Sequence, residues 1–293
     1  MIAARQIAFG RGGKKEESPA YRGLRFTAEA ANSSVQLTAV GSAPAVTLVK
    51  SFDGVNWEDY SVGEVIDLPS VGDYVYLAAG EGGNNAFGAS ASAYHKFVIN
   101  GLVAASGDIT SLRRFDLEQT KLATHCYNSM FNGCTGLTSA PELPATTLAT
   151  SCYQFMFIGC TGLTSAPELP ATTLATRCYQ SMFSGCTGLT SAPELPATKL
   201  ATFCYDSMFN GCTGLTSAPE LPATTLESRC YTTMFIGCTD LSLIKVHFTA
   251  WGTQTTNWVS NVSPTGTFYK PTALPEEYGT DKIPTGWTVV NID

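Results

Sequence analysis

Two hydrophobic patterns divide the chain. In the first, apolar and polar residues alternate, as in VQLTAV at residues 35–40 and DYVYL at residues 73–77. Turn signals that contain glycine, such as Gly41 and Gly54, interrupt these runs about every ten residues. A period of two is typical of half-buried strands. We therefore predict an antiparallel β-sandwich over residues 21–107.

In the second pattern, apolar residues stand four apart. From Leu148 they fall at Cys152 and Met156, with Tyr153 and Phe157 beside them. A spacing of i, i+4 and i+8 with a flanking stripe predicts one face of a helix, and a glycine follows where the helix would end. The next stretch, LTSAPELP, contains two prolines, which exclude helix and leave room only for a short strand. Together the two patterns predict an α+β fold.

The second pattern recurs because one segment of the sequence is repeated. CYNSMFNGCTGLTSAPELPATTLAT occupies residues 126–150, and close copies begin at Cys152, Cys178 and Cys204, with an incomplete fifth from Cys230. A strict period of 26 residues indicates a solenoid, in which each unit buries its apolar face only against its neighbours.

All ten cysteines lie in the copies, in pairs eight residues apart. If the stretch between them is helical, each pair is separated by about 12 Å, whereas a disulfide needs Cα atoms about 4.4–6.8 Å apart. Pairing along either ladder of five would leave one cysteine over. The spacing also fits zinc poorly. We predict buried free thiols that pack as small apolar side chains, with no metal and no other cofactor.

The motif C-Y-x-x-M-F-x-G-C-T-G-L-T-S-A-P-E-L-P resembles the BspA-like leucine-rich repeats found in surface proteins of gut bacteria and in their phages. The resemblance covers about residues 109–248. It implies a leucine-rich-repeat-like α/β solenoid that binds a partner, and not an enzyme. The predicted domains are an N-terminal arm (1–20), the β-sandwich (21–107), the solenoid of five units with a degenerate N-terminal cap (108–248) and a C-terminal cap (249–293).

A ladder of glutamates is the strongest candidate for chemistry: Glu142, Glu168, Glu194 and Glu220. Stacked strands would place neighbours about 4.8 Å apart, so the carboxylates either splay into water or share a cation such as calcium. A glycosidase requires one carboxyl group to act as an acid and another as a base or nucleophile, and four carboxyl groups in identical environments do not divide these roles. No Ser-His-Asp set or phosphate loop occurs. We predict no catalytic residue, and a glycan-cleaving enzyme is the weakest alternative.

The copies differ from one another at four positions, which lie 0, 3, 4 and 7 residues along from His125 and its equivalents. These offsets share one face of a helix, so we expect that face to point outwards. Its residues either vary because solvent places no constraint on them, or vary because they contact a partner. The apolar residues among them favour a partner. The candidate binding residues are His125, Phe155, Ile158, Arg177, Phe203, Arg229 and Ile236.

Charge and hydropathy limit the partners. The net charge of −7 argues against nucleic acid, whose phosphates need a basic surface. The sequence contains no run of 18 apolar residues, so it predicts no insertion into a membrane. The apolar run at the start of the chain is too short for a secretory signal, which favours a protein assembled in the bacterial cytoplasm.

The resulting hypothesis is a non-enzymatic phage virion component, such as a fibre, tail or capsid decoration protein. It would adhere to a bacterial surface protein or glycan, while the basic residues 1–20 contact other virion proteins. The alternative is a BspA-like adhesin of the bacterial cell surface whose leader has been removed. Phage fibres are often trimers, so a homo-oligomer remains open.

Overall fold

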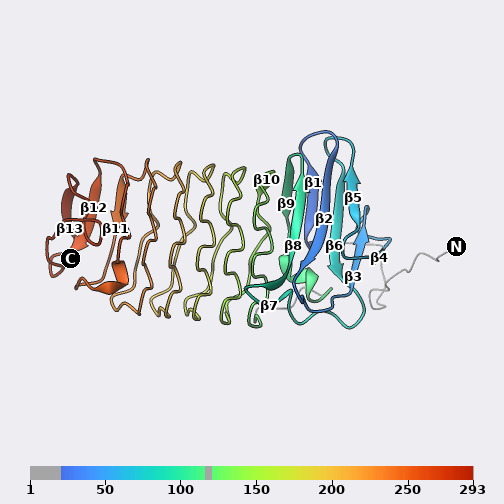
Figure 1. Ribbon diagram of the computed structural model, residues 1–293, viewed down its shortest axis with the longest axis horizontal. Helices are drawn as coiled ribbons and strands as arrows, with labels where there is room; N and C mark the ends of the chain where they lie inside the picture. The colour runs from blue at the N-terminus through green and yellow to red at the C-terminus, as the bar shows by residue number, and fades with distance from the viewer. Residues whose placement is uncertain (1–20, 116–120, 293) are drawn as a thin grey trace, which may run out of the picture.

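The computed structural model describes residues 21–115 and 121–292 (Figure 1). The predicted arm, residues 1–20, lies outside the described residues. Within them, the secondary structure consists of β-strands and two short 3₁₀ helices, η1 (Ile109–Leu112) and η2 (Thr253–Thr255), without any α-helix. The predicted α+β class is therefore wrong, and the chain is a β-rich protein with several sheets.

The part of the chain before the repeats forms two sheets, and β10 from the first copy adds an edge strand to the larger one. The larger has the strand order β10-β9-β1-β6-β3-β4 and the smaller the order β5-β2-β8-β7, and all neighbours are antiparallel except β9 and β10. The strands of the larger sheet are β1 (Arg25–Ala28), β3 (Leu48–Ser51), β4 (Glu58–Tyr60), β6 (Tyr74–Ala79), β9 (Val103–Ser106) and β10 (Leu137–Ser139). Those of the smaller sheet are β2 (Ser33–Val40), β5 (Val65–Leu68), β7 (Gly88–Ser90) and β8 (Ala93–Asn100).

The core of this region lies between the two sheets. In β2, Val35 and Leu37 are fully buried, while the side chains between them are less so. The ring of Phe26 in β1 meets the ring of Phe97 in β8 edge to face, with centroids 4.8 Å apart. Alternation along each strand therefore produces a shared apolar layer, as the period of two requires.

The repeated copies stack in register as successive layers, which run from the two sheets to β11 (Leu243–Lys245), β12 (Thr267–Pro271) and β13 (Thr288–Ile292) (Figure 1). Equivalent aromatic rings lie almost parallel in neighbouring layers. One stack joins Tyr127, Tyr153, Tyr179, Tyr205 and Tyr231, with centroids 5.8–6.1 Å apart. A second joins Phe131, Phe157, Phe183, Phe209 and Phe235 at 5.3–5.8 Å.

The stretch of each copy that we expected to be a helix is a chain of turns. In the second copy Ser151, Phe155 and Gly159 all have positive φ, at 56°, 59° and 72°. The Ile158 N–H donates to the carbonyl of Phe155 within the turn, whereas the Phe155 N–H donates to the carbonyl of Gln180 in the next layer. A helix needs consecutive right-handed residues and bonds to the residue four back. The predicted helices, and the α/β solenoid built from them, are therefore wrong.

Each cysteine in the described residues is free and buried. Burial raises the pKa of the Cys126 thiol to about 11 and that of Cys134 to about 12. The second cysteine of a copy also has a polar partner. The Cys186 thiol donates to the carbonyl of Phe157 in the preceding layer at 3.0 Å, and Cys134, Cys160, Cys212 and Cys238 make the equivalent bond.

The first layer continues the two sheets without a break in the core. The rings of Phe87 and Phe97 stack on Tyr127 and Phe131 and so extend both aromatic columns. The backbone N–H of Phe97 donates to the carbonyl of Met130 at 2.7 Å. The sheets therefore close one end of the stack by supplying both ring contacts and backbone donors.

A further turn layer follows the fifth copy. The Phe235 N–H donates to the carbonyl of Trp258, a fully buried residue, as it would to another copy. Asn257 and Asn261 have φ of 52° and 58° and take the place of the left-handed residues. The extended segments at this end of the stack, β11, β12 and β13, form a parallel sheet. No helix within the described part of the chain has the length and apolarity to cross a membrane.

Candidate binding surface on the turn columns

Stacking in register aligns the variable positions into columns. The Arg177 column contains His125, Ser151, Arg177, Phe203 and Arg229. The Phe155 column contains Ser129, Phe155, Ser181, Ser207 and Thr233, and the Ile158 column contains Asn132, Ile158, Ser184, Asn210 and Ile236. Backbone bonds such as Arg177 N–H to the Thr202 carbonyl, at 3.1 Å, hold each layer on the next. We refer to these three columns together as the turn face.

The backbone at two of these columns is left-handed. Every residue of the Arg177 and Phe155 columns has φ between 52° and 59°. This region costs an ordinary residue about 1–2 kcal/mol, and only glycine, asparagine and aspartate adopt it readily. Phe155, Phe203 and Thr233 therefore occupy positions where their own backbone preference opposes them.

The structure brings some of the predicted residues together and separates others. Arg177, Phe203 and Arg229 lie in consecutive layers of one column. Phe155 and Ile158 belong to a single turn, so they are also neighbours. Ile236 lies three layers from Ile158, roughly 15 Å at strand-like spacing, and His125 lies in the first layer next to the two sheets, where a side chain on Gly88 would meet its carbonyl.

An aromatic ring between two guanidinium groups is the most distinctive feature of the turn face. The guanidinium carbon of Arg177 lies 4.6 Å from the centroid of the Phe203 ring, and that of Arg229 lies 5.4 Å from it. Both arginines are exposed and Phe203 is half-buried. Because the arginines come from the layers on either side of Phe203, the three side chains form a cation–aromatic–cation sandwich.

The fourth variable position does not belong to this surface. Asn128 is fully buried and Gln154 is 6% exposed. The Asn128 amide donates to Gln154 at 3.2 Å, the Gln154 amide to Gln180 at 2.6 Å, and the Gln180 amide to Asp206 at 3.3 Å. The expectation that all four positions face outwards is thus wrong, because a ladder of side-chain hydrogen bonds satisfies these polar groups inside the stack.

His125 stands apart from the other candidates. Its Nδ1 is buried and has no hydrogen-bond partner among the described residues, and burial lowers the pKa of its imidazole. A neutral ring is therefore favoured, which gives this end of the column no added positive charge.

The glutamate ladder lies in the extended part of each copy, and its four side chains are exposed. Glu220 pairs with Lys245 at 2.9 Å and with His247 at 2.5 Å, and these hydrogen bonds lower the pKa of its carboxyl. A groove of about 480 Å³ lies between Glu142 and Glu168 and is bordered by prolines. Within residues 21–115 and 121–292, no three metal-ligating side chains gather at one point.

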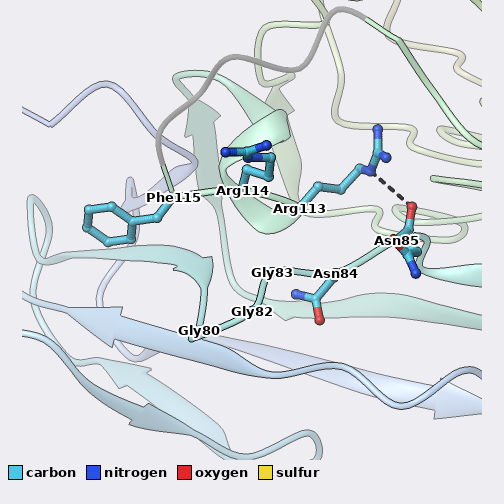
Figure 2. Close-up of a pocket in the computed structure, with 8 residues that line it drawn as sticks. All are labelled: Gly80, Gly82, Gly83, Asn84, Asn85, Arg113, Arg114 and Phe115. Atoms are coloured by element: carbon cyan, nitrogen blue, oxygen red, sulfur yellow. Dashed lines mark hydrogen bonds between the residues drawn. The ribbon is translucent and has the colours of Figure 1, made fainter.

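A separate hollow of about 620 Å³ lies between the loop that joins β6 to β7 and the residues that follow η1 (Figure 2). Two of its polar side chains donate hydrogen bonds to backbone carbonyls. The Arg113 guanidinium donates to the carbonyls of Asn85 and Lys121, at 3.0 and 2.8 Å. The Asn84 amide donates to the carbonyls of Thr47 and Leu112. These contacts give the hollow a role in holding loops together.

The sequence pointed to the arginines and phenylalanines of the turn face, but it did not show that they stack. The signal that was missed is the strict spacing of four, with serine, asparagine and glycine recurring at left-handed positions. Comparison of the chain with protein-family models, with curated proteins and with solved structures gives no match.

Proposed function

We propose that this chain is a non-enzymatic binding protein that uses the turn face to attach to a bacterial surface protein or glycan, as a component of a phage virion. One observation carries the proposal. Large, partly or fully exposed side chains occupy left-handed positions at Phe155, Phe203 and Arg177, where other copies carry buried serines such as Ser151 and Ser181. Strained conformations of this kind persist mainly where they serve a site.

The constancy of the rest of each copy supports this interpretation. Buried positions such as Tyr179, Met182 and Cys186 are the same in every copy, so packing fixes them. Apart from the buried amide ladder that begins at Asn128, the turn face is where side chains change from layer to layer while the backbone does not. A rigid scaffold that presents variable side chains is the usual construction of a binding surface.

Placement on a virion rests on the resemblance of the repeat motif to BspA-like repeats of gut bacteria and their phages. The alternative placement, on a bacterial cell surface, would use the same face. Mass spectrometry of purified particles from an induced culture of the producing strain tests the choice. Peptides of this chain in the particles support the virion, and their restriction to the cell envelope supports the adhesin.

Adhesion to cells tests the face itself. We expect Phe155→Ser with Phe203→Ser to abolish binding of the labelled protein to target bacteria, measured by flow cytometry. Serine already occupies the same column positions at Ser181 and Ser151, so the backbone accepts it. Both rings are only partly buried, so the pair should cost about 1–3 kcal/mol, and thermal unfolding checks that the variant is folded in the assay.

The matched control is Glu168→Ala with Glu194→Ala, which changes exposed side chains outside the turn face. Adhesion should survive this pair. If the glutamate pair abolished adhesion and the phenylalanine pair left it intact, the turn face would not be the binding surface.

A further inference from the structure

We infer that Arg177, Phe203 and Arg229 form a recognition site for an anionic polysaccharide, one that carries carboxylate or sulfate groups. This inference rests on the proposed function, because it assigns a ligand chemistry to the same turn face. The inference specifies which layers of the turn face bind the ligand and which ligand charge they select.

Neither guanidinium group donates a hydrogen bond to another residue in the described part of the chain. Among residues 21–115 and 121–292, no carboxylate forms an ion pair with Arg177 or Arg229. Glu227 stands only two residues before Arg229 and still does not pair with it. The chain has 24 acidic and 17 basic residues, so two unpaired and exposed arginines in one column are a local reversal of its charge.

The phenyl ring sets the geometry of these donors. A guanidinium that stacks on a ring uses its flat face, and its N–H groups then point outwards in the plane, where they can hold an oxyanion in a bidentate manner. Contact with Phe203 at 4.6 and 5.4 Å restrains both arginines. Less conformational freedom is therefore lost when an anion binds.

The spacing favours an extended ligand over a single small ion. The two arginines stand two layers apart, on the order of 10 Å at strand-like spacing, which is comparable to the length of a disaccharide. Phe203 lies between them with a guanidinium over each face, so it holds the two charges at this separation and offers a ligand only its edge.

The test measures binding of the full chain to polygalacturonate, to dextran sulfate and to neutral dextran by affinity electrophoresis. We expect retardation by the two anionic polymers only, and weaker retardation as salt rises, because the screening length shortens from about 30 Å at 0.01 M to about 8 Å at 0.15 M. Arg177→Gln with Arg229→Gln should weaken binding at least about tenfold, the change expected for loss of one charged hydrogen bond. Phe203→Leu should also weaken binding, and unchanged affinity in this variant would overturn the three-residue site.

Lys199→Gln is the matched control, because it removes one exposed positive charge from the same region of the stack but outside the turn face. An equal loss in this variant would show attraction to charge in general and would overturn the site. If the wild-type chain adhered to cells but bound neither anionic polymer, the inference would be wrong and the proposed function would stand. Binding to the polymers without adhesion to cells would support the site and contradict the proposed function.

Discussion

The two-sheet region and the stacked copies reach the same end, a buried apolar core, by different backbone geometry. In the sheets, extended strands alternate their side chains and pair with strands that are distant in sequence. In the copies, right- and left-handed residues follow one another in tight turns, and each second N–H bonds to the next layer, as Tyr153 does to the Cys178 carbonyl at 3.0 Å. The difference shows that hydrophobic spacing alone does not define the backbone that carries it.

The shared core suggests that the two regions are energetically coupled. The buried cluster runs from Leu24 in the sheets to Trp287 near the end of the chain. The rings of Phe87 and Phe97 belong to both regions, because they pack between the sheets and also cover the first layer. A substitution deep in the stack should therefore lower the free energy of unfolding as much as a substitution between the sheets.

The largest effect is expected from Met182→Ala in the middle layer. Met182 is fully buried, so its truncation leaves a cavity and should lower the free energy of unfolding by about 2–5 kcal/mol. Leu37→Ala in β2, also fully buried, should cost a similar amount. Urea denaturation followed by circular dichroism measures both. A neutral Met182→Ala would show that the stack is loosely packed and unlike the sheets.

A substitution of intermediate effect separates turns from helix directly. Ser181 has φ of 52°, and glycine adopts this conformation freely whereas alanine does not. We expect Ser181→Gly to be more stable than Ser181→Ala by about 1–2 kcal/mol, measured by thermal unfolding. In a helix the order would reverse, because glycine is about 1 kcal/mol worse than alanine there.

Ser184 provides the control for this pair, since its φ is not positive. Glycine at this position should not stabilise the chain, because it adds only conformational freedom to the unfolded state. A gain at Ser184 as large as that at Ser181 would mean that the effect is unrelated to the left-handed turn.

Part of the fold could be predicted from the sequence. The alternation at residues 35–40 falls within β2, and the period of 26 residues corresponds to one layer. The turns were misinterpreted because apolar residues at i, i+4 and i+8 also fit a helix. A spacing of four without any correction drifts around a helix of 3.6 residues per turn, and Leu148, Cys152, Met156 and Cys160 hold it strictly.

The sequence predicts which residues belong to the candidate site, but not how they are arranged. Comparison of the copies isolates the column that contains Arg177, Phe203 and Arg229, because the residue at this position changes among the copies. That they form a sandwich depends on the layer spacing, which sequence alone does not provide. The burial of Asn128 and Gln154 was unpredictable for a related reason, because one amide in isolation is polar surface, and only its stacked neighbours make it a buried ladder.

The smallest effect concerns the two cysteines of a copy, which are both buried but differ in hydrogen bonding. The Cys186 thiol donates to the Phe157 carbonyl at 3.0 Å, while for Cys178, in the same copy, the structure gives no such donation by its thiol. Replacing Cys186 with alanine removes a similar volume as replacing Cys178, but it also removes one of two donors to the Phe157 carbonyl. That carbonyl keeps the Cys160 N–H at 3.1 Å, so the extra cost should be only about 0.5 kcal/mol. Urea denaturation of Cys186→Ala beside Cys178→Ala measures the difference. Equal costs would mean that both thiols act only as small apolar side chains, and that the second cysteine is retained for its volume and not for its hydrogen bond.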